Sequence, residues 1–365
     1  MAAGFDGATV ASHLAHRSDN FLLLRIVAAL AVIYGHSFAI ARADGTVDLF
    51  VRHGWPMYSG DIAVAMFFVI SGFMVSGSYL ARADLFEFAK ARLLRLVPAF
   101  ALVLVSCAFV LGPILTTLDT RDYFRDPAVS EYVLKNLRFS SDMAWQLPGV
   151  FKANVRDAVN GSIWTLPAEM RMYLLVAALG VFGLLSHRAL GTATVAVLAW
   201  LGYTHPEFIP LHQDWFRLAF FFLLGILVQL HKDRLEVRHG AMLMLVFLVY
   251  LSMRTRAAPL LFGLALAYFC FWFAYRTPAW RALERGGDPS YGIYLWGWPV
   301  QQVLAATFPG MVPWHNFLLA AVLATCIGYL SWWCVERPAL KLKNWRPAIP
   351  GAIPLPRSKR SGVDS

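Results

Sequence analysis

Two ionisable residues, Arg25 and His36, lie within one otherwise apolar stretch, Phe21 to Ile40. In an α-helix this separation corresponds to a rise of roughly 16 Å and about 20° beyond three full turns, so both side chains share one face. Ionisable groups in membrane helices usually face a bundle interior or a wet cavity. An imidazole can act as a general base or a nucleophile, and a guanidinium binds anions. We therefore expect His36 to be catalytic and Arg25 to bind an anionic group, with a purely structural histidine as the alternative.

Further arginines lie at the start of a later apolar run. Arg92 and Arg95 are three positions apart in the sequence, so they are neighbours on one helix face. The N-terminus of a helix also favours anions through its free N–H groups and its dipole. We expect Arg92 and Arg95 to join Arg25 in binding an anionic substrate, although basic residues also anchor membrane spans.

Two acids are candidates for work beside the histidine. Glu169 and Asp61 each begin an apolar run, at the end that corresponds to the depth of His36. A carboxylate there could orient the imidazole and stabilise its protonated form. Each acid could instead be a helix N-terminal residue that the helix dipole favours.

Small and aromatic residues complete the candidate site. Ser71 and Gly72 could line a passage for the substrate, but small residues are also ordinary packing positions between membrane helices. Tyr291 and Tyr294 share a helix face and could wall a binding cavity, or else serve packing. No spacing of cysteine, histidine or acidic residues indicates a metal site or a disulfide framework.

The composition indicates the elements that position these residues. Of 365 residues, 58% are hydrophobic and only 15% are charged. Such a chain is a polytopic membrane protein. We predict an all-α transmembrane bundle of about ten helices, although short polar breaks leave nine or eleven open. The ten apolar runs lie near residues 21–40, 62–80, 96–112, 165–185, 189–204, 215–231, 240–253, 257–275, 290–308 and 316–335.

The distribution of charge predicts the topology. With a cytoplasmic N-terminus, most lysines and arginines fall in segments on the inner side, as the positive-inside rule requires. We therefore expect a cytoplasmic segment at 1–20, a transmembrane domain at 21–340 with an outer loop at about 113–161, and a basic, disordered cytoplasmic tail at 341–365. The net charge of +10 serves topology, and the scattered bases argue against nucleic-acid binding.

Six motifs in order resemble the acyltransferase-3 family of membrane-bound O-acyltransferases. They cover the chain from about Asn20 to Lys343. The motifs are the Arg25-x10-His36 pair, Phe67 to Phe73, Arg92-x-x-Arg95 before Val97-Pro98, Ile163 to Glu169 with Tyr173, Ser290 to Pro299, and Glu336-Arg337-Pro338.

The resemblance implies an enzyme of the bacterial inner membrane. It would take an acyl group, usually acetyl, from cytoplasmic acyl-CoA and transfer it to a hydroxyl of an envelope glycan, with no permanently bound cofactor. The rise from Arg25 to His36 is comparable to the length of a pantetheine arm. The chain departs from the pattern of the family at two positions. Gly297 occupies a position that is often histidine in the family, and Thr165 occupies one that is usually serine. A secondary transporter is the alternative, but the chain shows no internal repeat. The oligomeric state and the glycan are open.

Overall fold

The structure is a computed structural model. It describes residues 8–344, apart from 17–18, 42–45, 56, 206 and 208–211. Most of the predicted disordered tail and the first seven residues of the predicted N-terminal segment lie outside the described residues.

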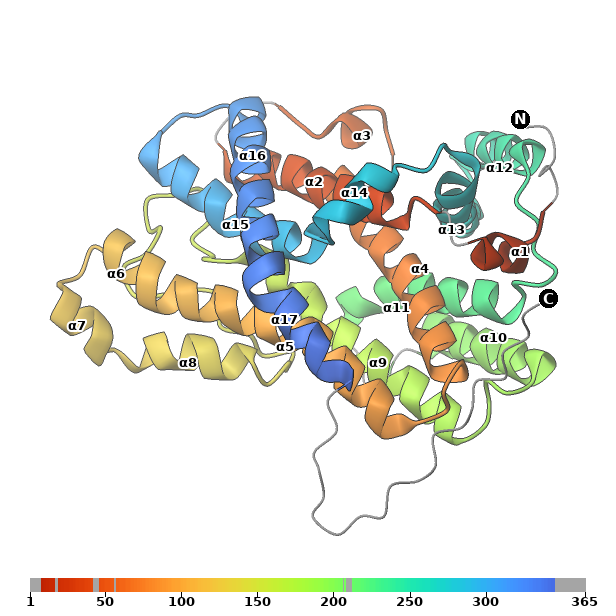
Figure 1. The fold of residues 1–365 in the computed structure, drawn as a ribbon. Helices are drawn as coiled ribbons and strands as arrows, with labels where there is room; N and C mark the ends of the chain where they lie inside the picture. Colours follow the sequence, from red (N-terminus) through yellow and green to blue (C-terminus); the bar gives the residue numbers. More distant parts are fainter. Residues whose placement is uncertain are drawn as a thin grey trace, which may run out of the picture.

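A helix forms at each of the ten predicted apolar runs (Figure 1). Five helical stretches are long and apolar enough to cross a membrane, and three shorter apolar helices accompany them. Within the described residues there is no strand, only an isolated bridge between Thr9 and Glu236. The prediction of an all-α membrane bundle is therefore confirmed. The ten helices are α2 (Phe21–Ile40), α4 (Ser59–Leu80), α5 (Leu85–Ser106), α9 (Leu166–Val181), α10 (Arg188–Thr204), α11 (Gln213–Leu230), α12 (His239–Ser252), α13 (Ala258–Arg276), α15 (Ser290–Thr307) and α16 (Pro313–Ser331).

Shorter helices lie between or beyond these ten. Two of the long helices continue through a π-helical turn, so that α5 passes through η1 into α6, and α16 passes through η4 into α17. The shorter elements are α1 (Val10–Ala15), α3 (Leu49–Arg52), η1 (Cys107–Leu111), α6 (Gly112–Leu115), α7 (Thr120–Arg125), α8 (Pro127–Asn136), η2 (Gly161–Thr165), α14 (Arg281–Gly286), η4 (Trp332–Glu336), α17 (Arg337–Lys341) and η5 (Leu342–Asn344).

The predicted outer loop is a folded segment. After α6 the chain turns through α7, and α8 then runs back along α5 (Figure 1). The hydroxyl of Tyr123 donates to the carbonyl of Ala108 at 2.7 Å, and the Asn136 side chain bonds with the backbone of Ala144. These bonds satisfy polar groups that would be costly to bury unpaired, and they hold the segment against the bundle.

The loops that we predict to lie on the same side of the membrane contact each other. On the predicted inner side, the N–H of Val10 donates to the carbonyl of Leu235 at 2.9 Å, and Arg188 pairs with Asp233 at 2.8 Å. On the predicted outer side, the Asn154 amide donates to the carbonyl of Gln302 at 3.0 Å. Segments assigned to one side thus contact each other.

Glycines bring the central helices close together. A Cβ on Gly72 of α4 would lie 2.0 Å from the carbonyl oxygen of Phe222 in α11, and one on Gly225 would lie 2.1 Å from that of Val69. The backbones of α4 and α11 are therefore in direct contact, as small residues allow in membrane bundles. Helices α2 and α9 pack on α4, and α5 and α15 complete the surroundings of a cavity.

Candidate active site

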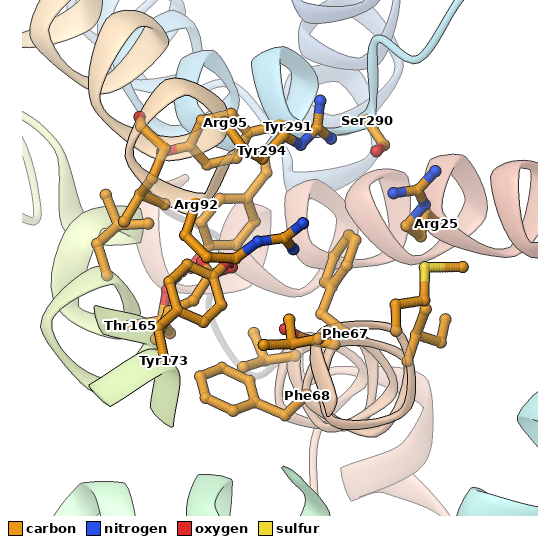
Figure 2. A pocket seen from close by; sticks show the side chains of 18 residues that line it. Arg25, Phe67, Phe68, Arg92, Arg95, Thr165, Tyr173, Ser290, Tyr291 and Tyr294 are labelled. Atoms are coloured by element: carbon orange, nitrogen blue, oxygen red, sulfur yellow. Dashed lines mark hydrogen bonds between the residues drawn. The ribbon is translucent and has the colours of Figure 1, made fainter. Parts of the chain in front are cut away.

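One cavity collects most of the predicted substrate-binding residues. Figure 2 shows Arg25 from α2, Arg92 and Arg95 from α5, and Tyr291 and Tyr294 from α15 around a common space. Ser71 and Glu169 also line it, and apolar residues of α4 form one wall. We call it the arginine cavity; its empty volume is about 870 Å³, including the open mouth. Five separate helices contribute to it, so only the folded bundle assembles the site.

Two of the three arginines already have carboxylate partners. Asp288, in the loop before α15, lies 3.1 Å from Arg25 and 2.7 Å from Arg95, and Glu336 lies 3.3 Å from Arg95. The Ser290 hydroxyl donates to Asp288 at 2.6 Å. Burial opposes ionisation of Asp288, but Arg95, Arg25 and the bonds from Ser290 outweigh it and hold its pKa at about 2. Asp288 is thus a fixed anion that positions two guanidiniums.

Arg92 differs from the other two arginines. Among the described residues no carboxylate lies within ion-pair distance of its guanidinium, which lies 5.8 Å from the centre of the Tyr173 ring and 6.0 Å from that of Phe88. In Figure 2 it projects into the cavity between Tyr173 and Phe67. A guanidinium held by aromatic faces keeps its N–H donors available, so Arg92 is the best placed of the three to receive an added anion.

Glu169 belongs to the arginine cavity. Its carboxylate accepts a hydrogen bond from the Tyr173 hydroxyl, and it interacts electrostatically with Arg95 and Arg92. It also lies in the first turn of α9, where the dipole favours an acid. Among the described residues no hydrogen bond or ion pair joins it to His36, which lines a different cavity. The structure thus places Glu169 with the arginines, and its role beside the imidazole stays a prediction.

Two more candidates lie away from the cavity. Asp61 forms an ion pair with Arg217 of α11 at 2.7 Å, in the first turn of α4. Gly72 faces Phe222 in the contact between α4 and α11. Gly72 therefore serves helix packing, because the backbone of Phe222 covers the place where a side chain would be. Ser71 beside it does line the arginine cavity.

The two tyrosines of α15 have different partners. The hydroxyl of Tyr291 donates to the carbonyl of Leu96 at 3.0 Å, and its ring lies beneath Arg95 at 5.7 Å. The hydroxyl of Tyr294 donates to the carbonyl of Ser162 at 2.6 Å and lies 2.6 Å from that of Thr165. Both hydroxyls are therefore tied to the protein, and the rings serve as cavity walls.

His36 lies in a second cavity. Gly35, Asp48, Tyr58, Arg156 and Trp298 line it with the imidazole. We call it the histidine cavity; its empty volume is about 1150 Å³, including the open mouth. It is bounded by segments that we predict to lie on the outer side. Helix α2 thus contributes Arg25 to one cavity and His36 to the other.

The imidazole is held by packing. Its ring meets that of Trp298 edge to face, with centroids 4.8 Å apart. Its Nδ1 is buried and has no hydrogen-bond partner among the described residues. Within the described residues, therefore, no hydrogen bond from the protein fixes the proton state of Nδ1.

Sequence reasoning gave no role to three acids that the structure puts near these cavities. Glu336 begins one of the quoted motifs and Asp288 lies two residues before another, but only the fold brings them to Arg95. Asp48 lies in a loop and lines the histidine cavity, where it accepts the Ser59 hydroxyl at 2.5 Å and the N–H of Phe50 at 2.8 Å. A loop acid of this kind carries no periodic signal. No group of three metal-ligating residues occurs in the part of the chain that the structure describes.

Comparison with known proteins decides the class of this arrangement. The model of an acyltransferase domain, that of the acyltransferase-3 family, matches residues 19–333. The chain belongs to this family. It is 28% identical over 346 residues to the O-acetyl transferase of Shigella phage Sf6, covering 88% of this chain and 96% of that protein. It is 27% identical over 369 residues to Nodulation protein 10 of Rhizobium leguminosarum bv. viciae, covering 91% and 96%. No solved structure matches the chain.

Membership of the acyltransferase-3 family confirms the resemblance and makes the protein an acyltransferase of the membrane. It also decides against the secondary transporter. The departure at Gly297 has a structural reason: a Cβ there would lie 2.7 Å from the Ile33 side chain of α2. A bulky residue at this position would push α15 away from α2, so a histidine does not fit here without repacking.

Proposed function

We propose that the protein transfers an acyl group, most simply acetyl, from cytoplasmic acyl-CoA to a hydroxyl of an envelope glycan on the outer side of the bacterial inner membrane. The observation that carries this proposal is the pair of cavities at the two ends of α2, one with three arginines and the other with His36. The printed name of the phage relative, an O-acetyl transferase, supports acetyl as the group transferred.

In this proposal the arginine cavity receives the donor. Guanidiniums recognise phosphates through planar, charge-assisted hydrogen bonds, and CoA carries several phosphates. Arg92 supplies free donors, while Arg25 and Arg95 are held in place by Asp288. The apolar wall, which includes Val64 and Phe67, suits the thioester end of the molecule.

The transfer would take place at His36. The hydroxyl oxygen of the acceptor attacks the thioester carbonyl, the carbon–sulfur bond breaks, and the hydroxyl proton passes through the imidazole to the CoA sulfur. The products are an ester and CoA with a free thiol. In the second possible route the imidazole first carries the acyl group and the hydroxyl then removes it. Both routes need an imidazole nitrogen without a proton.

The histidine cavity has the features of a sugar-binding site. Trp164, Trp298 and Tyr58 offer aromatic faces, while Asp48 and Arg156 offer hydrogen-bonding groups. Pockets of this kind combine large apolar faces with a few polar groups that fix the orientation of the ligand. A glycan hydroxyl could therefore be held beside His36.

The test measures CoA release from acetyl-CoA by the purified, detergent-solubilised protein, with and without crude envelope glycan. Glycan-stimulated release in the wild type that is lost in His36→Ala supports the proposal. His315→Ala is the matched control because His315 is exposed at the start of α16, outside both cavities. Release that is unaffected by His36→Ala would remove His36 from the mechanism. No release with any acyl-CoA and any acceptor would refute the proposal as a whole.

A further inference from the structure

The two cavities border on the same short segment of chain. Thr165 at the end of η2 lines the arginine cavity, whereas Gly161 and Trp164 line the histidine cavity. On α15 the same division occurs within one helical turn, because Tyr294 lines the arginine cavity and Trp298 the histidine cavity. We call η2 together with Tyr294 and Trp298 the dividing wall.

Side chains of α15 hold the dividing wall closed. Because the Tyr294 hydroxyl donates its one proton to the Ser162 carbonyl, the Thr165 hydroxyl must donate to Tyr294, and both distances are 2.6 Å. Trp298 donates from its indole to the Ala158 carbonyl at 2.9 Å. Gly161 lies so close to Trp298 that a Cβ would be 2.7 Å from its ring. The wall therefore depends on α15 at both of its faces.

The Tyr294 ring packs in the arginine cavity. The Phe67 ring meets it edge to face there, with centroids 5.9 Å apart. The Tyr294 hydroxyl bonds to Ser162 and Thr165 of η2, the segment whose Gly161 and Trp164 line the histidine cavity. Tyr294 thus joins the lining of one cavity to the segment that lines the other.

From this arrangement we infer that Tyr294 is a positioning and specificity-determining residue. This inference rests on the proposed function. An acyl group anchored in the arginine cavity must pass Tyr294 to reach the oxygen that attacks it beside His36. The hydrogen bonds of Tyr294 keep the wall nearly closed, so that only a short acyl group passes and water is kept from the thioester. When the wall opens, water replaces the glycan hydroxyl, and acyl-CoA plus water gives a free carboxylic acid and CoA.

The test compares Tyr294→Phe with Tyr123→Phe. Both variants lose one buried tyrosine hydroxyl that bonds to a backbone carbonyl, but that of Tyr123 bonds to Ala108 and lies outside both cavities. For each purified protein, CoA release is measured with and without envelope glycan, using acetyl-CoA, butanoyl-CoA and octanoyl-CoA. Tyr294→Phe removes two neutral hydrogen bonds from the wall, and the loss of each one shifts a closed–open equilibrium by about threefold to tenfold.

We expect Tyr294→Phe to raise the glycan-independent fraction of CoA release by about threefold to tenfold for each lost bond and to increase the relative rate with longer chains. Tyr123→Phe should leave both quantities at wild-type values. Thr165→Val, which removes one bond to Tyr294 with little change of shape, should move them in the same direction as Tyr294→Phe and provides a second variant if Tyr294→Phe folds poorly.

Three results would count against the inference in different ways. Unchanged glycan-independent release and chain-length order in both wall variants would show that Tyr294 is only structural. Equal changes in Tyr123→Phe would show that the effect is not specific to the wall. A wild type that releases no CoA would remove the proposed function, and the inference with it.

Discussion

At the scale of single residues, the charges of the arginine cavity divide into fixed and available groups. Asp288 and Glu336 neutralise Arg25 and Arg95, whereas Arg92 rests between aromatic rings. The cavity therefore offers one guanidinium that forms no ion pair among the described residues, where three arginines suggested three. The first two arginines still have N–H donors to spare, because a guanidinium carries five.

This division predicts a specific kinetic effect of Arg92→Gln. Loss of a charge-assisted hydrogen bond costs about 1.5–3 kcal/mol, so we expect KM for acetyl-CoA to rise by tenfold or more. With acetyl-pantetheine, which lacks the nucleotide phosphates, wild type and variant should have the same KM. Steady-state kinetics with both thioesters measures this. Arg82→Gln, at an exposed position in the preceding loop, is the control. An equal loss with both thioesters would place the contact of Arg92 elsewhere than on phosphate.

Asp288→Asn should destabilise the protein. Its carboxylate is 14% exposed and holds two arginines, and removal of one partner from a buried ion pair costs about 3 kcal/mol. The control is Asp233→Asn. The Asp233 side chain is 55% exposed, so its ion pair with Arg188 should contribute little to stability. Thermal unfolding of both variants in detergent makes the comparison. Equal melting temperatures for the two variants would contradict the assignment.

The effect of Asp288→Asn should also depend on pH. Because the pKa of Asp288 is lowered to about 2, its stabilisation is present above its unfolded-state pKa of about 4 and is lost as the pH falls towards the folded-state value. The difference in melting temperature between wild type and variant should therefore be constant from about pH 5 to about pH 8. It should shrink as the pH falls below about 4.

At the scale of elements, the sequence predicted which helices form better than it predicted which side chains meet between them. The ten helices follow from hydrophobic run length, which is a local property. The gathering of Arg25, Arg92 and Arg95 follows from their common depth. What the sequence left open is rotation about each helix axis: Glu169 faces the arginines, and Gly72 faces α11. Rotation is set by packing against neighbours, and no signal within a single helix reports it.

The contact between α4 and α11 leads to a prediction about Gly72→Ala. The added methyl would meet the carbonyl of Phe222, so the helices must separate, and overpacking of this kind costs about 1–3 kcal/mol. We expect a clear drop in melting temperature. Gly240→Ala is the matched control, since nothing lies within 4 Å of a Cβ there and α12 gains a better helix former. A change in KM for acyl-CoA with an unchanged melting temperature would instead mean that Gly72 lines the substrate path.

At the scale of the whole molecule, the two cavities divide the bundle into an arginine end and a histidine end. The loops at each end contact one another, and the bases are concentrated on the side of the arginine cavity. From the positive-inside rule we predict that the arginine cavity faces the cytoplasm, the side from which the proposed donor, acyl-CoA, would come. The orientation of the bundle in the membrane therefore determines the direction of acyl transfer.

Labelling of single cysteines answers that question. In a background with Cys107, Cys270, Cys326 and Cys334 replaced by alanine, Asp157→Cys reports the histidine end and Asp233→Cys the arginine end; both positions are at least 45% exposed. A membrane-impermeant maleimide applied to spheroplasts should label only Asp157→Cys, and both after permeabilisation. The reverse pattern would direct the arginine cavity outwards, away from cytoplasmic acyl-CoA. Transfer from acyl-CoA by the cysteine-free protein must persist for the labelled state to count as native, because buried cysteines such as Cys107 contribute to packing.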